Sequence, residues 1–194
     1  MTDLGQRTAK LARTQVGVSE APPKSNCTIY GQWAESVGGK DGVEWCGNFA
    51  SWCVAEASDG TRAVLEGAPI PEDDAGVYRE TGLDTGTFGH GGVAYGCDHA
   101  PTIERWGRGR HKAKVLWIEP GLREFEPGDI LCIAVPRRGE DPLTQHARHV
   151  AVFERYDDEG ATIVAVAGNV GNSVQEQRWE ADNETVLGGI RFIE

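Results

Sequence analysis

The chain has 194 residues, enough for one domain with a hydrophobic core, and its 30 acidic against 19 basic residues give a formal charge of −11. An acidic surface argues against a nucleic-acid partner, because binding phosphate needs basic side chains. No apolar run reaches the roughly 18 residues of a membrane span, and the N-terminus lacks the apolar stretch of a signal peptide. We therefore expect a protein that is made in the cytoplasm and does not insert into a membrane.

Three helices are expected in the first third of the chain. A loose helical stripe covers residues 3–16, and a shorter helical segment covers residues 27–37. The third helix begins at Cys46 and ends at Ser58-Asp59-Gly60. Its apolar or small residues follow the i, i+3, i+4, i+7 spacing of one buried face: Cys46, Phe49, Ala50, Cys53, Val54 and Ala57.

Residues 60 to about 125 show little periodicity. Glycine, proline and acidic residues are scattered through this stretch, and only residues 101–106 have a helix-like pattern. A segment of this length with so weak a pattern predicts an insertion, such as a lid or a substrate wall. We expect residues 1–194 to form a single domain that carries this insertion.

From Pro127 onward the pattern changes to strands. Apolar or alternating runs cover residues 128–135, 149–156, 161–167, 173–180 and 190–193. Helices followed by a strand meander predict the α+β class, with N-terminal helices packed on an antiparallel sheet of about five or six strands.

A hairpin between two of these strands brings distant residues together. If Asp158-Glu159-Gly160 forms a three-residue loop, Asp157 pairs with Ala161 and His149 lies opposite Asn169. A two- or four-residue loop instead moves His149 opposite Gly168. In either register His149 and Asn169 lie at the same end of adjacent strands, within side-chain reach.

Cys46 is a candidate nucleophile. The positive end of the helix dipole is expected to lower the pKa of a thiol in the first turn, which favours the thiolate. Most buried cysteines do no chemistry, and Cys53, two turns further along, is expected to be inert. The five cysteines are an odd number without a dense spacing pattern, which argues against a disulfide framework.

A thiol followed by a histidine and an asparagine has the order and chemistry of a papain-like enzyme. His149 would take the thiol proton and later protonate the leaving amine, while Asn169 would hold the imidazole in place. The backbone N–H of Cys46 would donate to the oxyanion. His146, three residues before His149, is the alternative base.

Several short motifs resemble the CHAP family, the cysteine, histidine-dependent amidohydrolases/peptidases. The nucleophile motif corresponds to residues 45–53, the first strand to residues 127–130, the histidine strand to residues 148–153 and the asparagine turn to Gly168-Asn169. Residues 17–20 and 30–33 also stand where the family has similar segments. The resemblance covers both ends of the chain and skips roughly residues 60–125.

This resemblance implies a papain-like core and hydrolysis of amide bonds in peptidoglycan. The activity would be that of an N-acetylmuramoyl-L-alanine amidase or a cell-wall endopeptidase, in a phage lysin or a bacterial wall hydrolase. Such a protein would act at the bacterial cell wall after release or non-classical export. The sequence leaves open which amide bond is cut and the oligomeric state.

The resemblance also implies which residues form the site. Cys46, His149 and Asn169 would be catalytic, and Trp45 and Tyr30 are candidates for substrate binding. Many family members have an acidic residue two positions before the asparagine, where this chain has Ala167. Some members bind calcium through an acidic loop before the nucleophile, but residues 19–26 contain only one acid, so neither metal nor cofactor is expected.

Three other readings remain open. A zinc site could draw on Cys and His side chains, namely His90, Cys97, His99, Cys132, His146 and His149, although no pair has the spacing of a closed site. The chain could be a catalytically silent wall-binding or phage structural module of the same fold. It could also be a papain-like peptidase that acts on proteins, because the chemistry is the same and only the groove differs.

Overall fold

The computed structural model describes residues 3–36, 41–57, 115–121, 124–135 and 147–192, and it has the predicted α+β class. These residues form three α-helices, which are α1 (Asp3–Thr14), α2 (Ile29–Ser36) and α3 (Cys46–Ala57). They also form six strands, β1 (Val115–Ile118), β2 (Ile130–Ile133), β3 (His149–Asp157), β4 (Thr162–Val170), β5 (Ser173–Glu180) and β6 (Val186–Phe192). Among the helices in these ranges, none combines the length and the apolar character needed to cross a membrane.

All six strands belong to one antiparallel sheet in the order β1-β6-β2-β3-β4-β5. Edge strand β1 pairs with β6 and lies inside the segment predicted as an insertion over residues 60–125, so the sheet includes part of that segment. A four-residue edge strand is too short to show a strand period in the sequence. The helix expected over residues 101–106, and most of the predicted insertion, lie outside the described residues.

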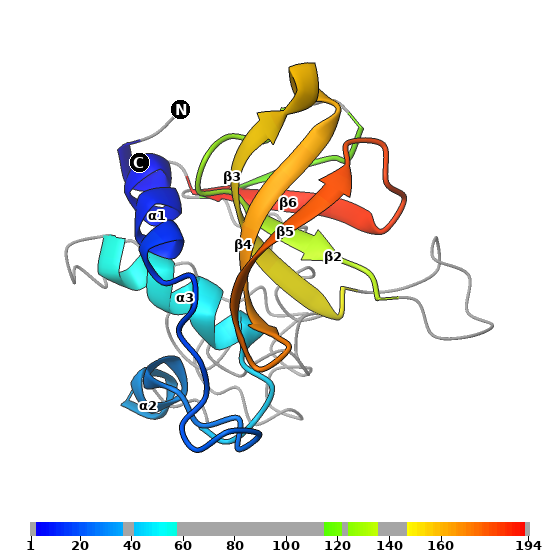
Figure 1. The fold of residues 1–194 in the computed structure, drawn as a ribbon. Helices are drawn as coiled ribbons and strands as arrows, with labels where there is room; N and C mark the ends of the chain where they lie inside the picture. Colours follow the sequence, from blue (N-terminus) through cyan, green and yellow to red (C-terminus); the bar gives the residue numbers. More distant parts are fainter. Residues whose placement is uncertain (1–2, 37–40, 58–114, 122–123, 136–146, 193–194) are drawn as a thin grey trace, which may run out of the picture.

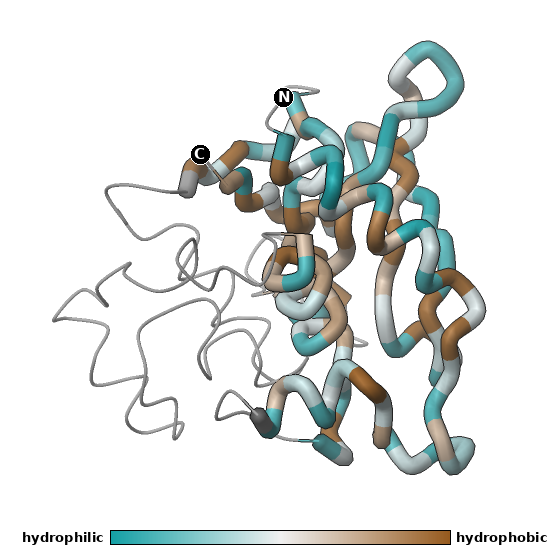
Figure 2. The backbone as a smooth tube through the Cα atoms, turned by 90° about the vertical axis from the view of Figure 1, so that its left-hand side faces the viewer, coloured by the Kyte–Doolittle hydropathy of each residue, from teal (hydrophilic) through white to brown (hydrophobic). Residues whose placement is uncertain are grey.

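Helices α1 and α3 pack on one face of the sheet, and α2 packs on α3 (Figure 1). On β2, Ile130 and Cys132 face the helices, while Leu131 and Ile133 belong to a second apolar cluster on the opposite face. That second face is covered by Phe125 and by other apolar side chains of the sheet. Burial on both faces explains why β2 is a continuous apolar run. Figure 2 shows hydrophobic residues gathered on the inner elements and hydrophilic ones at the hairpin tip at the top.

A buried ion pair fastens the start of β2 to β6. Arg191 donates two hydrogen bonds to the carboxylate of Asp129, at 3.0 and 2.8 Å, and one to Glu126 at 3.0 Å. Asp129 is 2% exposed and also accepts the backbone N–H of Glu126 at 2.8 Å. Burial raises the pKa of Asp129, although its bonds to Arg191 and Glu126 oppose this shift. The aspartate is therefore both a turn residue and a link between two strands.

The β3–β4 hairpin differs in detail from the prediction. Asp157 pairs with Thr162 rather than with Ala161, so the turn contains four residues, one of the loop lengths that the sequence left open. Asp158 and Glu159 adopt left-handed conformations, with φ of 53° and 55°, which widens the turn. Three residues from the turn, a bulge at Glu154 shifts the register back, so Val152 pairs with Val166 as expected for a three-residue loop.

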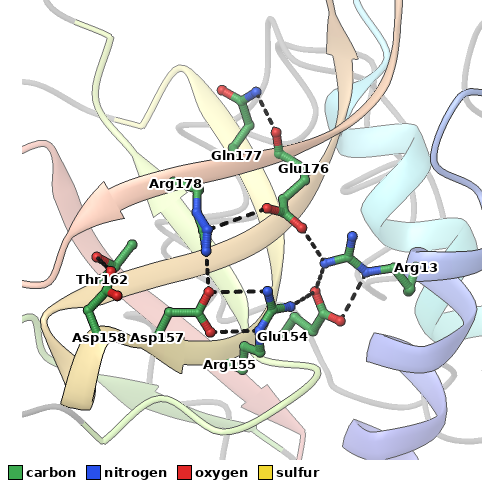
Figure 3. A network of polar contacts seen from close by, with 9 residues as sticks. All are labelled: Arg13, Glu154, Arg155, Asp157, Asp158, Thr162, Glu176, Gln177 and Arg178. Carbon is green, nitrogen blue, oxygen red and sulfur yellow. Dashed lines mark hydrogen bonds and ion pairs between the residues drawn. The ribbon is translucent and has the colours of Figure 1, made fainter.

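Ion pairs surround the bulge and join it to α1 (Figure 3). Arg13 of α1 contacts the carboxylate of Glu154, at 3.0 Å from Nε to Oε1, and that of Glu176 on β5 at 2.8 Å. Arg155 lies 2.9 Å from Glu154 and 2.8 Å from Asp157. These charges are partly exposed, so the network contributes modestly to stability, but its geometry favours the bulged register.

Candidate active site

The fold brings the predicted nucleophile and the predicted base into contact. Cys46 is the first residue of α3 and is fully buried, and His149 is the first residue of β3 and is half-buried. A side-chain hydrogen bond joins the thiol and the imidazole. This contact depends on α3 packing across β3 and β4, which sets the helix start beside the start of β3.

The surroundings of His149 favour its protonated form. Burial by itself lowers the pKa of His149, but the charge and hydrogen bond of Cys46, with a further contribution from the charge of Glu44, outweigh burial and raise this pKa above its usual value. An imidazolium beside a sulfur is the state that a thiolate nucleophile requires. The pair is therefore arranged for proton exchange between sulfur and ring.

Glu44, two residues before Cys46, is exposed. Its carboxylate nevertheless lies near enough to His149 to contribute to the raised pKa of the imidazole. Ala167, two positions before Asn169, is buried in the apolar cluster on the far face of the sheet. The acidic charge that acts on the imidazole thus comes from the segment before the nucleophile.

Asn169 lies near the end of β4, at the same end of the sheet as the start of β3. If the register of Val152 with Val166 continued to the strand ends, Asn169 would lie opposite His149. Asn169 has a left-handed backbone conformation, with φ of 59°, which asparagine tolerates better than most residues. The side-chain hydrogen bond of His149 goes to Cys46, and an orienting role for Asn169 stays a prediction.

The two candidates for substrate binding, Tyr30 and Trp45, are fully buried. Their rings are stacked with centroids 5.6 Å apart, and Tyr30 also meets Phe49 edge-on at 5.1 Å. The hydroxyl of Tyr30 donates to the side chain of Gln15 at 3.1 Å. Both rings therefore pack in the core beneath Cys46, and a direct contact with substrate stays a prediction.

The two thiols of α3 lie in different environments. Cys53 is fully buried, and burial raises its pKa well above the usual value, which keeps this thiol neutral. The pKa of the Tyr30 hydroxyl is also raised, first by burial and then by the charge of Cys53. The thiol at the helix start is instead joined to an imidazole.

The alternative zinc ligands are not brought together in the part of the chain that the structure describes. Cys132 is buried on β2, where it faces the helices. His90, Cys97, His99 and His146, the last of these also the alternative base, lie outside the described residues. Across the described ranges, no group of three or more His, Cys, Asp or Glu side chains could hold a metal ion.

Sequence reasoning missed one buried acid close to the site. Glu20 accepts a hydrogen bond from the indole N–H of Trp45 at 3.0 Å and is 5% exposed. A lone glutamate in a loop has no periodicity, so only its occurrence in the segment resembling the CHAP family could have drawn attention to it.

Comparison of the chain with protein-family models, with curated proteins and with solved structures finds no match in any of the three. The functional assignment therefore depends on the site itself and on the motifs of the sequence.

Proposed function

We propose that this chain is a papain-like thiol hydrolase that cleaves amide bonds of peptidoglycan, as an amidase or a cell-wall endopeptidase. The observation that supports this most is the hydrogen bond between the Cys46 thiol, at the start of α3, and the His149 imidazole. A thiol at a helix N-terminus beside a histidine with a raised pKa is the arrangement that activates a cysteine nucleophile.

The reaction would run in two steps. In the first, the Cys46 thiolate attacks the carbonyl carbon of the amide, the carbon–nitrogen bond breaks, and the imidazolium of His149 gives its proton to the leaving amine. In the second, His149 takes a proton from water, the resulting hydroxide attacks the thioester, and the thiolate leaves with a carboxylate as product. Asn169 would orient the imidazole in both steps.

The start of α3 suits the developing negative charge. Backbone N–H groups in the first turn of a helix have no acceptor within the helix and point toward its N-terminal end. The N–H of Cys46 would therefore donate to the oxyanion of the tetrahedral intermediate. The helix dipole adds positive potential at the same place, which stabilises both the thiolate and the oxyanion.

The substrate class follows from the motifs rather than from the geometry. The segments around Cys46, His149 and Asn169 resemble those of CHAP enzymes, which act on peptidoglycan, so peptidoglycan is the proposed partner. The site of action would be the bacterial cell wall, reached after release or non-classical export. No cofactor or metal takes part in the proposed steps.

Digestion of purified peptidoglycan tests the proposal. The wild-type protein should release soluble fragments, and Cys46→Ala should lower the rate at least about 1,000-fold because the nucleophile is lost. Cys27→Ala is the matched control, since Cys27 is a half-buried thiol whose sulfur lies near the carbonyl of Ser25, and it should keep full activity. Mass spectrometry of the fragments would identify the bond that is cut.

Other outcomes would assign the chain differently. Undiminished lysis by Cys46→Ala would contradict the thiol mechanism. Cleavage of unfolded protein but not of peptidoglycan would assign the same chemistry to protein substrates. Slow, equal alkylation of all the thiols by iodoacetamide at neutral pH, together with wall binding without lysis, would favour a silent wall-binding module.

A further inference from the structure

Glu20, in the loop after α1, is a buried acid beside the proposed site. It is 5% exposed, and its Oε1 accepts the indole N–H of Trp45 at 3.0 Å. Its Oε2 is also buried and has no hydrogen-bond partner among the described residues. Burying a carboxyl group with one oxygen unsatisfied is unfavourable for folding. We therefore expect Glu20 to have a role that offsets this loss of stability.

The partner of Glu20 lies between the proposed catalytic elements. Trp45 immediately precedes Cys46, and its ring contacts the backbone of Gly168, which immediately precedes Asn169. A Cβ added to Gly168 would lie 2.8 Å from Cζ3 of Trp45 and 2.7 Å from Cβ of Phe49. The indole ring and Phe49 therefore both lie against the end of β4, and together they set its separation from the start of α3.

The segment that carries Glu20 is also tied to the turn between β4 and β5. Val174 N–H donates to Val18 at 2.8 Å, and Gly17 N–H donates to Val174 at 2.9 Å. Ser19 and Ser173 form an isolated antiparallel bridge, and the N–H of Glu20 donates to the carbonyl of Asn172 at 3.2 Å. One short segment thus contacts both the turn that follows Asn169 and the ring that precedes Cys46.

We propose that Glu20 is a positioning residue, which through Trp45 holds the nucleophile at the correct distance from the end of β4 that carries Asn169. This inference rests on the proposed function, because it assigns Glu20 a role in the same site. Glu20 touches neither substrate nor the reacting atoms. Its contribution is to limit the rotation of the indole ring, and therefore the position of the first turn of α3 relative to His149.

Three variants test the hydrogen bond. Glu20→Ala and Trp45→Phe each remove one partner, and each should lower kcat about 10- to 100-fold with KM changed by less than about twofold, since misplacing reacting groups acts on the chemical step. Glu20→Gln keeps an oxygen acceptor for the indole and should restore kcat to within about threefold of the wild type. Glu35→Ala, which removes an exposed acid of α2, is the matched control and should leave kcat unchanged.

A double-mutant cycle separates positioning from general destabilisation. If Glu20 acts through Trp45, the double variant Glu20→Ala/Trp45→Phe should be about as active as the less active of the two single variants. Both single changes remove the same interaction, so the second change has nothing further to remove. Multiplicative losses of activity would show that the two residues act independently and would overturn the inference. Thermal unfolding of each variant would verify that it is folded at the assay temperature.

Alkylation of Cys46 by iodoacetamide gives a readout that needs no substrate. Glu20→Ala and Trp45→Phe should slow alkylation of Cys46, measured by peptide mass spectrometry, while alkylation of Cys27 stays unchanged. This pattern without peptidoglycan hydrolysis would support the role of Glu20 and contradict the proposed substrate. If Glu20→Ala fails to fold, Trp45→Phe decides: wild-type alkylation and kcat in that variant would overturn the inference.

Discussion

The indole ring of Trp45 and the backbone of Gly168 are in direct contact, so close that a Cβ on Gly168 would lie 2.8 Å from Cζ3 of the ring. The two residues immediately precede Cys46 and Asn169. The contact therefore links the start of α3 to the end of β4, and any residue larger than glycine would push the two elements apart.

Gly168→Ala should destabilise the protein by about 1–3 kcal/mol and lower kcat, because the added methyl group overlaps with Trp45 and Phe49. Urea unfolding at equilibrium and steady-state kinetics would measure the two effects. Gly121→Ala is a useful control: nothing lies within 4 Å of its Cβ, but its φ is +87°. That control should lose about 1 kcal/mol through backbone strain while kcat stays unchanged. An unaltered unfolding free energy in Gly168→Ala would contradict this account.

The pH dependence of hydrolysis should reflect the raised pKa of His149. Because the imidazolium protonates the leaving amine, kcat should fall as pH rises through the pKa of His149, and this alkaline limb should lie above pH 6.5, the usual value for histidine. In Cys46→Ala, burial would still lower the pKa but the sulfur would no longer raise it. An NMR titration should then show a lower His149 pKa than in the wild type, and an equal or higher value would contradict the assignment.

Glu44→Gln should also lower the pKa of His149, because the carboxylate of Glu44 contributes to raising it. The alkaline limb of kcat should therefore move to lower pH. The change in the pKa of His149 should be smaller in Glu44→Gln than in Cys46→Ala, because Cys46 has a larger effect on this pKa than Glu44. Added salt should reduce the difference, because Glu44 is exposed. Glu56→Gln, at the other end of α3, is the control and should leave the pH dependence of kcat unchanged. A profile identical in both variants would exclude a role for Glu44.

Asp129→Ala should be strongly destabilising, by about 2–4 kcal/mol, because it leaves the guanidinium of Arg191 without its main partner in a mostly buried position. Asp157→Ala, which breaks contacts of the exposed network with Arg155 and Arg178, should have a much smaller effect. Guanidinium chloride unfolding of the two variants would measure the difference. Equal losses of unfolding free energy in the two variants would show that burial of the Asp129–Arg191 pair does not add to stability.

Much of the fold could be predicted from local patterns. The helix that begins at Cys46 and the strands that begin at His149 and Ser173 start where the sequence predicted. Strand β6 begins at Val186 rather than Ile190, because Gly188 and Gly189 interrupt the apolar run that identifies a strand. The sequence left the length of the hairpin turn open, and four residues are needed because Asp158 and Glu159 adopt left-handed conformations that favour glycine.

The sequence by itself determined where Cys46, His149 and Asn169 stand, at the start of a helix and at the ends of two adjacent strands, because periodicity and turn signals are local properties. Only the tertiary structure decided that the thiol bonds to the imidazole, that a bulge at Glu154 restores the register, and that Glu20 holds Trp45. These contacts depend on burial and close packing between segments far apart in the chain, and no local pattern of residue types specifies them.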